Sequence, residues 1–361
     1  MSNDASTLVV AASRSRTVNI LLGVALLLVL VDIVTAEAGG WASAQFVVGA
    51  LALIPLAFVI GEATERLSEH TGPVVGGLLN ATMGNAPELM VSLFAVAGGL
   101  FTVVRASLVG SVVSNLLLVL GTSMVFAPRG RVSRSSVIGA LGQVGLAVVL
   151  FTGMAVHYGW RQSGQQSSWF DLPLCAILLV LYVALTARSV RAAMVEQRKN
   201  REAAGAVQPE WSLRKGLAYL VLATAATVVV THVVTDTIEA FASASGLGLF
   251  FTSAVVVALV GNAAEHGGAV VVAARGNRDL ALEISLSSSA QVAVFVLPVV
   301  ALLSATFAPL PMAFEPVEII SLAIAVALPA LVLGRGSSSR VRGGVLLVGY
   351  LVLASVYFIA G

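Results

Sequence analysis

Two glutamates stand in matching strings within long apolar runs. The first string is Gly84-Asn85-Ala86-Pro87-Glu88 and the second is Gly261-Asn262-Ala263-Ala264-Glu265. No basic residue lies within either run. A charged side chain such as Asp at the centre of a membrane span costs about 2.5–3.5 kcal/mol on insertion scales. Two such residues at matching places therefore indicate ion handling rather than a structural acid.

The residues around each glutamate predict oxygen ligands. A Gly-Asn pair weakens a helix, and in the first string Pro87 also removes a backbone donor and frees carbonyl oxygens. Carboxylate, amide and carbonyl oxygens are the set that Ca2+ prefers at six- to eightfold coordination, whereas Mg2+ would have to keep several waters. Soft metals favour Cys, Met or His clusters. The chain has one cysteine, Cys175, and the one histidine near the strings is His266.

Paired carboxylates also suggest a coupling mechanism. Two facing carboxylates in a poorly solvated site repel each other, so at least one holds a proton when no cation is bound. A divalent ion displaces those protons. If the empty, doubly ionised site cannot change its orientation, cation and protons must move in opposite directions, which is antiport.

Composition places these strings in a membrane. The 361 residues are 58% hydrophobic and 11% charged, with a mean hydropathy of +0.97, whereas soluble domains carry about 25% charged residues. Segments of about 20 apolar residues predict an all-α membrane protein with about eleven transmembrane helices. The expected helices are 17–36, 44–63, 73–98, 106–127, 136–157, 170–189, 216–235, 248–274, 281–304, 317–334 and 343–360.

Basic residues in the connections predict the orientation. With the N-terminus in the cytoplasm, only Arg105 and Arg161 of the 20 basic residues fall outside, as the positive-inside rule favours. The C-terminus is then outside. The apolar run 17–35, followed by Ala36-Glu37-Ala38, superficially resembles a signal peptide, but its length favours a retained first helix. Asp32, near the outer end of that helix, is expected to be interfacial.

The spacing of polar residues predicts an internal repeat. Ser111 follows Glu88 by 23 residues and Ser288 follows Glu265 by 23; Asn115 and Gln291 follow the same glutamates by 27 and 26. Helices 2–6 and 7–11 are therefore expected to form two five-helix repeats, inverted in the membrane, with helix 1 as an extra. Such repeats bind substrate near mid-membrane. The predicted organisation is an N-terminal segment with the first helix (1–39), a first repeat (40–190), a basic cytoplasmic linker (191–215) and a second repeat (216–361).

Over residues 40 to 361 the chain resembles the calcium/cation antiporter superfamily, specifically its Ca2+/H+ exchanger branch. Four strings carry the resemblance: residues 79–88 (LNATMGNAPE), 110–121 (GSVVSNLLLVLG), 261–266 (GNAAEH) and 287–291 (SSSAQ). One departure is the linker, which is acidic in many members of the family and basic here. An acidic regulatory helix is therefore not expected.

The resemblance implies a set of site residues. The cation would be held by the carboxylates of Glu88 and Glu265 and by backbone oxygens around Gly84 and Gly261, with Asn85 and Asn262 beside them. Further residues would lie along the cation or proton path: Ser111, Asn115, Ser288 and Gln291. The polar residues in these sets could instead cross-link helices by hydrogen bonds, and the serines could simply permit close helix approach.

Three further residues are candidates for the same path. Glu65 and Glu239 each precede a glycine by seven residues, at helix ends, which suggests cation entry or gating, although an interfacial acid needs no function. His266 follows Glu265 directly and is a candidate for proton transfer, with helix packing as the alternative.

The sequence thus predicts a secondary transporter that exchanges cytoplasmic Ca2+ for protons by alternating access in the cell membrane. No enzyme motif, catalytic residue, bound cofactor or nucleic-acid partner is expected; Ca2+ and H+ are substrates, and the lipid bilayer is the surrounding medium. A Na+-coupled Ca2+ exchanger is the nearest alternative, and a passive cation channel a more remote one. Stoichiometry and oligomeric state stay open.

Overall fold

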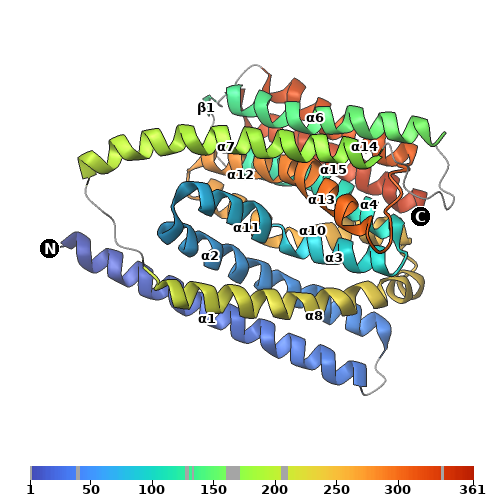
Figure 1. The fold of residues 1–361 in the computed structure, drawn as a ribbon, viewed down its shortest axis with the longest axis horizontal. Coiled ribbons are helices and arrows are strands. Elements are labelled where there is room, and N and C mark those ends of the chain that lie inside the picture. Colours follow the sequence, from blue (N-terminus) through green and yellow to red (C-terminus); the bar gives the residue numbers. More distant parts are fainter. Residues whose placement is uncertain are drawn as a thin grey trace. The chain divides into compact units, whose positions relative to one another are not determined.

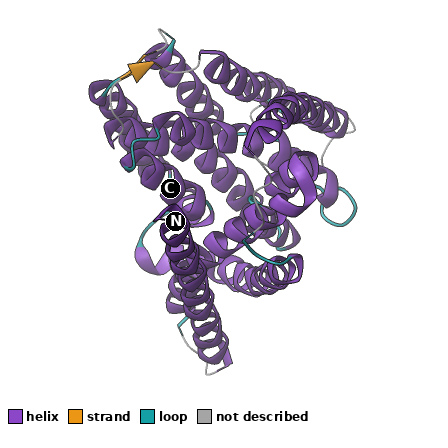
Figure 2. Cartoon of the chain, turned by 90° about the vertical axis from the view of Figure 1, so that its left-hand side faces the viewer, coloured by secondary structure: helices purple, strands orange, loops and turns teal. Residues whose placement is uncertain are grey.

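In a computed structural model, residues 2–37, 41–126, 130–131, 134–159, 171–204, 210–334 and 337–361 are described. Nearly all of them are helical (Figure 2). The exceptions are turns and two short strands, β1 (Gly130–Arg131) and β2 (Ser337–Ser338), which pair antiparallel. The described chain is therefore an all-α protein, as predicted.

The helices form two compact units, each built from separated parts of the chain: residues 1–90 with 183–237, and residues 91–182 with 238–361. We call them unit 1 and unit 2. Unit 1 contains α1 (Ser2–Glu37), α2 (Ala42–Met83), the start of α3 (Ala86–Ala97), the end of α7 (Asp171–Ala204) and most of α8 (Leu213–Ser245). Unit 2 begins with the end of α3, followed by α4 (Phe101–Val113), η1 (Ser114–Val119), α5 (Leu120–Phe126), α6 (Arg134–His157) and the start of α7. It continues with α9 (Leu249–Phe251), η2 (Thr252–Val257), α10 (Ala258–Gly261), α11 (Ala263–Ala274), α12 (Arg278–Gln291), η3 (Val292–Val296), α13 (Leu297–Ser304), α14 (Pro316–Leu333) and α15 (Arg340–Ala360).

The expected spans correspond to these helices. Nine described helices are long and apolar enough to cross a membrane, and the bent pair formed by 249–261 and 263–274 is a tenth candidate. The third expected span, 73–98, is divided: its first part continues α2, and α3 follows a turn at Gly84 and Asn85. A count of about eleven is compatible with this arrangement.

Several helix boundaries differ from the expectation. Helix α2 is continuous from Ala42 to Met83, although a loop was expected between 63 and 73; proline is tolerated in membrane helices, and Pro73 does not end this one. Helix α4 begins at Phe101, so Arg105 lies inside a helix rather than in an outer loop. Helix α7 continues to Ala204, through the first part of the expected linker, and residues 205–209 lie outside the described residues.

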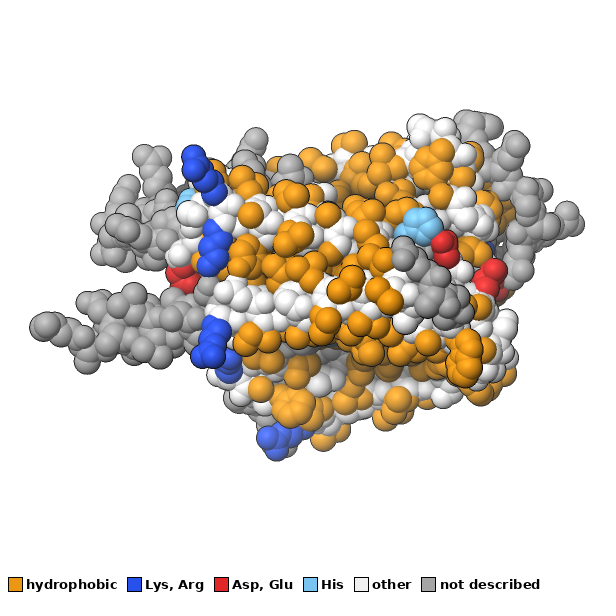
Figure 3. All heavy atoms as spheres, turned by 90° about the horizontal axis from the view of Figure 1, so that it is seen from below, with side chains coloured by type: hydrophobic (Ala, Val, Ile, Leu, Met, Phe, Trp, Pro, Cys, Tyr) orange, Lys and Arg blue, Asp and Glu red, His pale blue; other side chains and the backbone are white. Residues whose placement is uncertain are grey.

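In unit 1, α1, α2 and α8 run side by side (Figure 1). A Cβ atom on Gly49 of α2 would lie 2.8 Å from Val234 of α8, and one on Gly216 of α8 would lie 2.9 Å from Leu67 of α2. Small residues of this kind allow membrane helices to approach closely. The surface on the side of α1 and α8 is mostly hydrophobic, with basic residues gathered toward one end (Figure 3). Such a surface suits contact with lipid.

Polar contacts join the residues just before α8 to α2. The guanidinium of Arg66 on α2 lies 2.8 Å from the carboxylates of both Glu62 and Glu69, and 3.0 Å from that of Glu210. His70 contacts the carbonyl of Trp211 at 2.6 Å. The end of the predicted linker is thus fixed to α2 within unit 1.

Unit 2 contains three π-helical segments, η1, η2 and η3, at positions that the sequence did not reveal. Segments η1 and η3 lie at matching places in the expected repeats. Segment η1 follows Ser111 and includes Asn115, and η3 directly follows the helix that carries Ser288 and Gln291. π-Helical turns within longer helices occur frequently at functional sites. The backbone irregularity therefore marks the helices that carry the predicted site residues.

Candidate functional site

Glu88 and Glu265 occupy the same local position in two matching helix breaks. Glu88 is the third residue of α3 and Glu265 is the third residue of α11, and both helices are 12 residues long. In each case the residue after the glutamate donates a backbone hydrogen bond to the preceding asparagine carbonyl, from Leu89 to Asn85 at 3.0 Å and from His266 to Asn262 at 2.9 Å. The two breaks share one backbone pattern.

The second break is sharp. The segments 249–261 and 263–274 are bent by 60° at Asn262, whose backbone is not helical (φ −91°, ψ 16°). The last carbonyls of a helix lack partners within it, and they carry the negative end of the helix dipole. Carbonyl oxygens near Gly261, at the end of α10, are therefore suited to a cation. Gly84 lies in the corresponding turn at the end of α2, so the carbonyl oxygens near it have the same position relative to a helix end.

The site residues are enclosed. Glu88 is 6% exposed, while Asn85 and Asn262 are almost completely buried. Glu265 is half-buried, but its Oε2 atom is enclosed and has no hydrogen-bond partner among the described residues. A buried carboxylate oxygen without a partner is costly, so this oxygen is placed to receive a proton or a cation.

Four predicted residues from both repeats form one hydrogen-bonded group in unit 2. The Asn262 amide donates to the Ser111 hydroxyl at 2.7 Å and to the Ala258 carbonyl at 2.9 Å. The Asn115 amide donates to the Asn262 side-chain oxygen at 3.3 Å and to the Ser288 hydroxyl at 3.0 Å. We call Ser111, Asn115, Asn262 and Ser288 the amide cluster.

One side-chain oxygen of the amide cluster, Asn115 Oδ1, accepts no hydrogen bond within the described chain. Both N–H groups of Asn115 are used by Asn262 and Ser288, and the buried Asn115 Oδ1 has no hydrogen-bond partner within the described chain. The cluster therefore fixes the orientation of Asn115 and offers an additional neutral oxygen. Neutral amide oxygens are ligands that Ca2+ accepts alongside carboxylates.

His266 has a partner that the sequence reasoning missed. Its Nε2 atom lies 3.5 Å from the hydroxyl of Ser114, which begins η1. Ser114 is completely buried and donates to the backbone carbonyl of Ser111 at 3.1 Å. Ser114 lies three residues after Ser111, on the same side of the helix, and this spacing could have indicated from the sequence that Ser114 is also near the site.

The remaining candidates differ from the amide cluster in exposure. Gln291 is the last residue of α12 and is partly exposed. Glu65 on α2 and Glu239 on α8 are both exposed, in unit 1 and unit 2 respectively. Their roles in cation entry stay predictions.

A buried ion pair in unit 2 was also missed. Arg105 of α4 is 4% exposed, and its Nε atom lies 3.5 Å from the carboxylate of the completely buried Glu318. Arg105 also donates to the carbonyl of Pro311 at 3.3 Å, and the Glu318 carboxylate accepts from the backbone of Glu315 at 2.6 Å. The pair fixes the helix that carries Ser111 to the start of α14. The sequence gave no indication that Arg105 is buried, because the residue stands next to an expected helix boundary.

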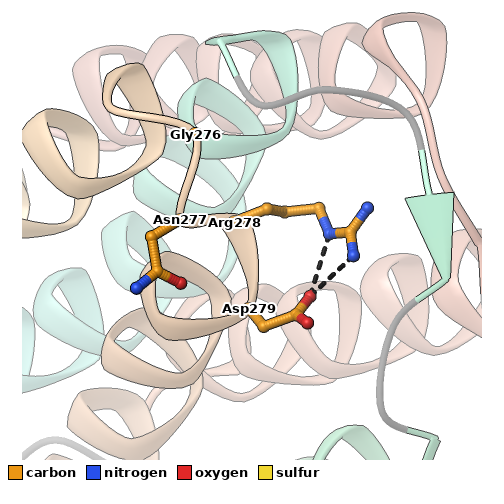
Figure 4. A pocket seen from close by; sticks show the side chains of 4 residues that line it. All are labelled: Gly276, Asn277, Arg278 and Asp279. Carbon is orange, nitrogen blue, oxygen red and sulfur yellow. Dashed lines mark hydrogen bonds and ion pairs between the residues drawn. The ribbon is translucent and has the colours of Figure 1, made fainter.

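One small surface hollow does not coincide with these residues. It lies at the turn between α11 and α12 and is lined by Gly276, Asn277, Arg278 and Asp279, where Arg278 points toward Asp279 (Figure 4). The Arg278–Asp279 contact of 2.7 Å and the Asn277 cap on Leu280 account for its polar groups. This hollow is a helix-capping turn and contains no predicted site residue.

The kinds of residue present bear on the metal. Within the described ranges, no three His, Cys, Asp or Glu side chains gather closely enough to hold a metal ion. The oxygen atoms available beside each glutamate in this part of the chain are those of amides, hydroxyls and the backbone. That ligand chemistry is the one expected for Ca2+.

Comparison with known proteins gives the family. The sodium/calcium exchanger protein family matches residues 41–191 and 215–359. The Ca(2+)/H(+) antiporter ChaA of Bacillus subtilis (strain 168) is 35% identical over 88% of this chain and 93% of its own length. Vacuolar cation/proton exchanger 1a of Oryza sativa subsp. japonica is 34% identical, over 87% of this chain and 74% of its own.

Solved structures give the fold. The structure of native YfkE superposes with a TM-score of 0.78 and 30% identity, over 95% of this chain and 99% of that one. These relatives are transporters, not enzymes. The chain is thus a multi-pass membrane protein that belongs to the sodium/calcium exchanger protein family and, within it, to the Ca2+/H+ exchanger branch.

Proposed function

We propose that this protein exchanges cytoplasmic Ca2+ for protons by alternating access, with Glu88 and Glu265 binding cation and protons in turn. The observation that carries the proposal is their shared position, each the third residue of a 12-residue helix after a Gly-Asn break. The names of the relatives, which are Ca2+/H+ and cation/proton exchangers, support the choice of substrates.

The ligand set supports Ca2+. Glu88 and Glu265 would supply the negative charge, with backbone oxygens near Gly84 and Gly261 and the amide groups of Asn85 and Asn262 completing the shell. The burial of Glu88, Asn85 and Asn262 supports a dry site in which a divalent cation replaces water with protein oxygens.

Exchange follows from the charge of these glutamates. With Ca2+ bound, both carboxylates are ionised; when Ca2+ leaves, their charge is exposed in poorly solvated surroundings and protons bind. A site that changes access only when it is neutralised by Ca2+ or by protons carries the two in opposite directions. His266, beside Ser114, is the proposed neighbour for proton transfer.

The distribution of elements supports alternating access through two inverted repeats. Unit 1 contains α2 and most of α8, and unit 2 contains α4 and α12, so each unit takes matching helices from both expected repeats. Two units that each combine both repeats suit a transporter in which one body moves against another. We place the protein in the cell membrane with a cytoplasmic N-terminus, because that orientation puts most basic residues inside.

The proposal is tested with purified protein in liposomes that contain a pH-sensitive dye. When Ca2+ is added outside in the absence of Na+, inward Ca2+ movement should drive protons outward and alkalinise the interior. A pH change that requires Na+ would favour the Na+-coupled alternative. Ca2+ entry with no proton movement would contradict exchange and indicate a channel.

A further inference from the structure

The place of Asp32 near the end of the first span suggested an interfacial residue. In the structure Asp32 is buried instead. It is 1% exposed, and neither carboxylate oxygen has a hydrogen-bond partner among the described residues. A Cβ atom on Gly49 of α2 would lie 3.5 Å from Asp32 Oδ2 and 3.6 Å from Val230 of α8. The carboxyl group is thus enclosed where α1, α2 and α8 meet within unit 1.

The surroundings of Asp32 offer no compensating charge. Gly49, Val230 and Val234 line the contact, and both carboxylate oxygens of Asp32 lack a hydrogen-bond partner among the described residues. On α8, His232 and Asp236 are the nearest charged groups in sequence, and they pair with each other at 2.8 Å on an exposed face.

Of the charged groups on the other two helices, only Glu37 of α1 is near in sequence, five residues after Asp32. On α2 the first of them, Glu62, is 13 residues beyond Gly49, about 20 Å along the helix at 1.5 Å per residue. On α1, Arg16 is 16 residues before Asp32, and Glu37 ends the helix.

An ionised carboxylate in such a place is unfavourable. Burying an unpaired charge among apolar groups costs several kcal/mol, and proteins usually avoid the cost by neutralising the group. Ionisable residues inside membrane spans are accordingly rare and mark functional positions. In the observed packing, the neutral acid is the form of Asp32 that its neighbours stabilise.

We propose that Asp32 is a proton-binding carboxyl group separate from the cation site, and that its neutral form holds α1 against α2 and α8. Loss of the proton as the pH rises leaves an unpaired charge in this contact. The contact must then open to water or shift. Packing of the first helix is therefore linked to pH through one residue outside both repeats.

The test compares thermal unfolding of the wild type with that of Asp32→Asn across a range from mildly acidic to alkaline pH, in detergent without Ca2+. Asparagine has the same shape and stays neutral. We expect the wild-type midpoint to fall by several degrees relative to the variant as the pH rises, because the folded wild type binds a proton that the unfolded chain releases more readily. Asp32→Ser is measured alongside, so that the comparison does not depend on one variant.

Controls separate protonation from packing. Gly49→Ala disturbs the same contact but neither adds nor removes a titratable group. Relative to the wild type, it should therefore lower the unfolding midpoint by the same amount at every pH. Asp279→Asn removes a carboxyl group that is 72% exposed and should leave the pH profile unchanged.

Infrared absorption gives an independent reading. The wild-type spectrum minus the Asp32→Asn spectrum should contain a protonated carboxylic acid band. Parallel wild-type and Asp32→Asn unfolding profiles, or stabilisation of the wild type alone by Na+ or K+ at fixed pH, would overturn the proposal. Ca2+/H+ exchange is measured separately in liposomes, so failure of the proposed transport function would be seen independently.

Discussion

Asn115 and Asn262, which come from the two expected repeats, are joined directly by an amide hydrogen bond of 3.3 Å inside unit 2. The Asn262 amide also donates a hydrogen bond to the Ser111 hydroxyl, and the Asn115 amide donates one to the Ser288 hydroxyl. Polar motifs that are about 150 residues apart in the sequence thus meet in one buried group. This contact is the most direct structural link between the motifs and the break that carries Glu265.

Substitutions in the amide cluster should act according to the number of bonds removed. Asn262→Ala removes the donor to Ser111 and the acceptor of Asn115, and we expect Ca2+ transport to fall about tenfold or more, a change of roughly 1.4 kcal/mol. Ser288→Ala should be milder, because Asn115 keeps its bond to Asn262. Initial rates of Ca2+ uptake over a range of Ca2+ concentrations measure both.

Ser289→Ala is the matched control for the cluster. Ser289 is equally buried, but its hydroxyl donates to the backbone carbonyl of Ser285 at 2.8 Å and not to the cluster. Its substitution should leave transport near the wild-type level. Equal losses in Ser288→Ala, Ser289→Ala and Asn262→Ala would mean that the cluster has no special part in transport.

The two glutamates should be indispensable for exchange and dispensable for insertion. Glu88→Gln and Glu265→Gln keep the side-chain shape but remove the charge that binds Ca2+ or protons, so exchange should be abolished while the protein still inserts and purifies. Glu283→Gln, which changes an exposed acid on α12, should transport normally. Normal exchange by either site variant would refute its assignment.

The buried pair of Arg105 and Glu318 should matter more for stability than an exposed pair. Breaking a buried pair leaves an unpaired charge and costs about 3–5 kcal/mol, whereas the double substitution Arg105→Met with Glu318→Met should recover much of the loss. Thermal unfolding in detergent reports both. Asp279→Asn, which breaks the exposed pair with Arg278, should cost at most about 1 kcal/mol. A double variant as unstable as the sum of the single ones would show that the two residues do not act as a pair.

Gly110 should not tolerate a side chain. A Cβ atom there would lie 1.9 Å from the Ala254 carbonyl oxygen in η2, so α4 and η2 could not keep their distance. Gly110→Ala should destabilise the protein by about 1–3 kcal/mol or more and disturb Ser111, the next residue. Gly153→Ala, in open space on α6, should be neutral or slightly stabilising. Comparable unfolding midpoints for the two variants would contradict the close contact.

Most of the architecture could be predicted from the sequence because apolar length and helix-breaking pairs are local signals. Long apolar runs predicted the helices, and the Gly84-Asn85 and Gly261-Asn262 pairs predicted breaks where the structure has them. One exception is 63–73, where glutamates and a proline suggested a loop and α2 instead continues.

The features that were missed depend on contacts between distant segments. Burial of Arg105 follows from Glu318 and Pro311, more than 200 residues away, and burial of Asp32 follows from the close approach at Gly49. The π-helical segments depend on packing, because no residue type encodes them in the way that Gly-Asn encodes a break. The four residues of the amide cluster could be named from the sequence as candidates, but their mutual hydrogen bonds required the fold.

Uptake of radioactive Ca2+ into liposomes, with and without an imposed pH difference and free of Na+, tests the central claim most directly. A pH difference of one unit supplies about 1.4 kcal/mol per proton. The wild type should therefore concentrate Ca2+ in the proton-rich compartment and alkalinise it, and Glu265→Gln should not. Ca2+ flux that ignores the pH difference, or that appears only with a Na+ gradient, would contradict Ca2+/H+ exchange by this protein.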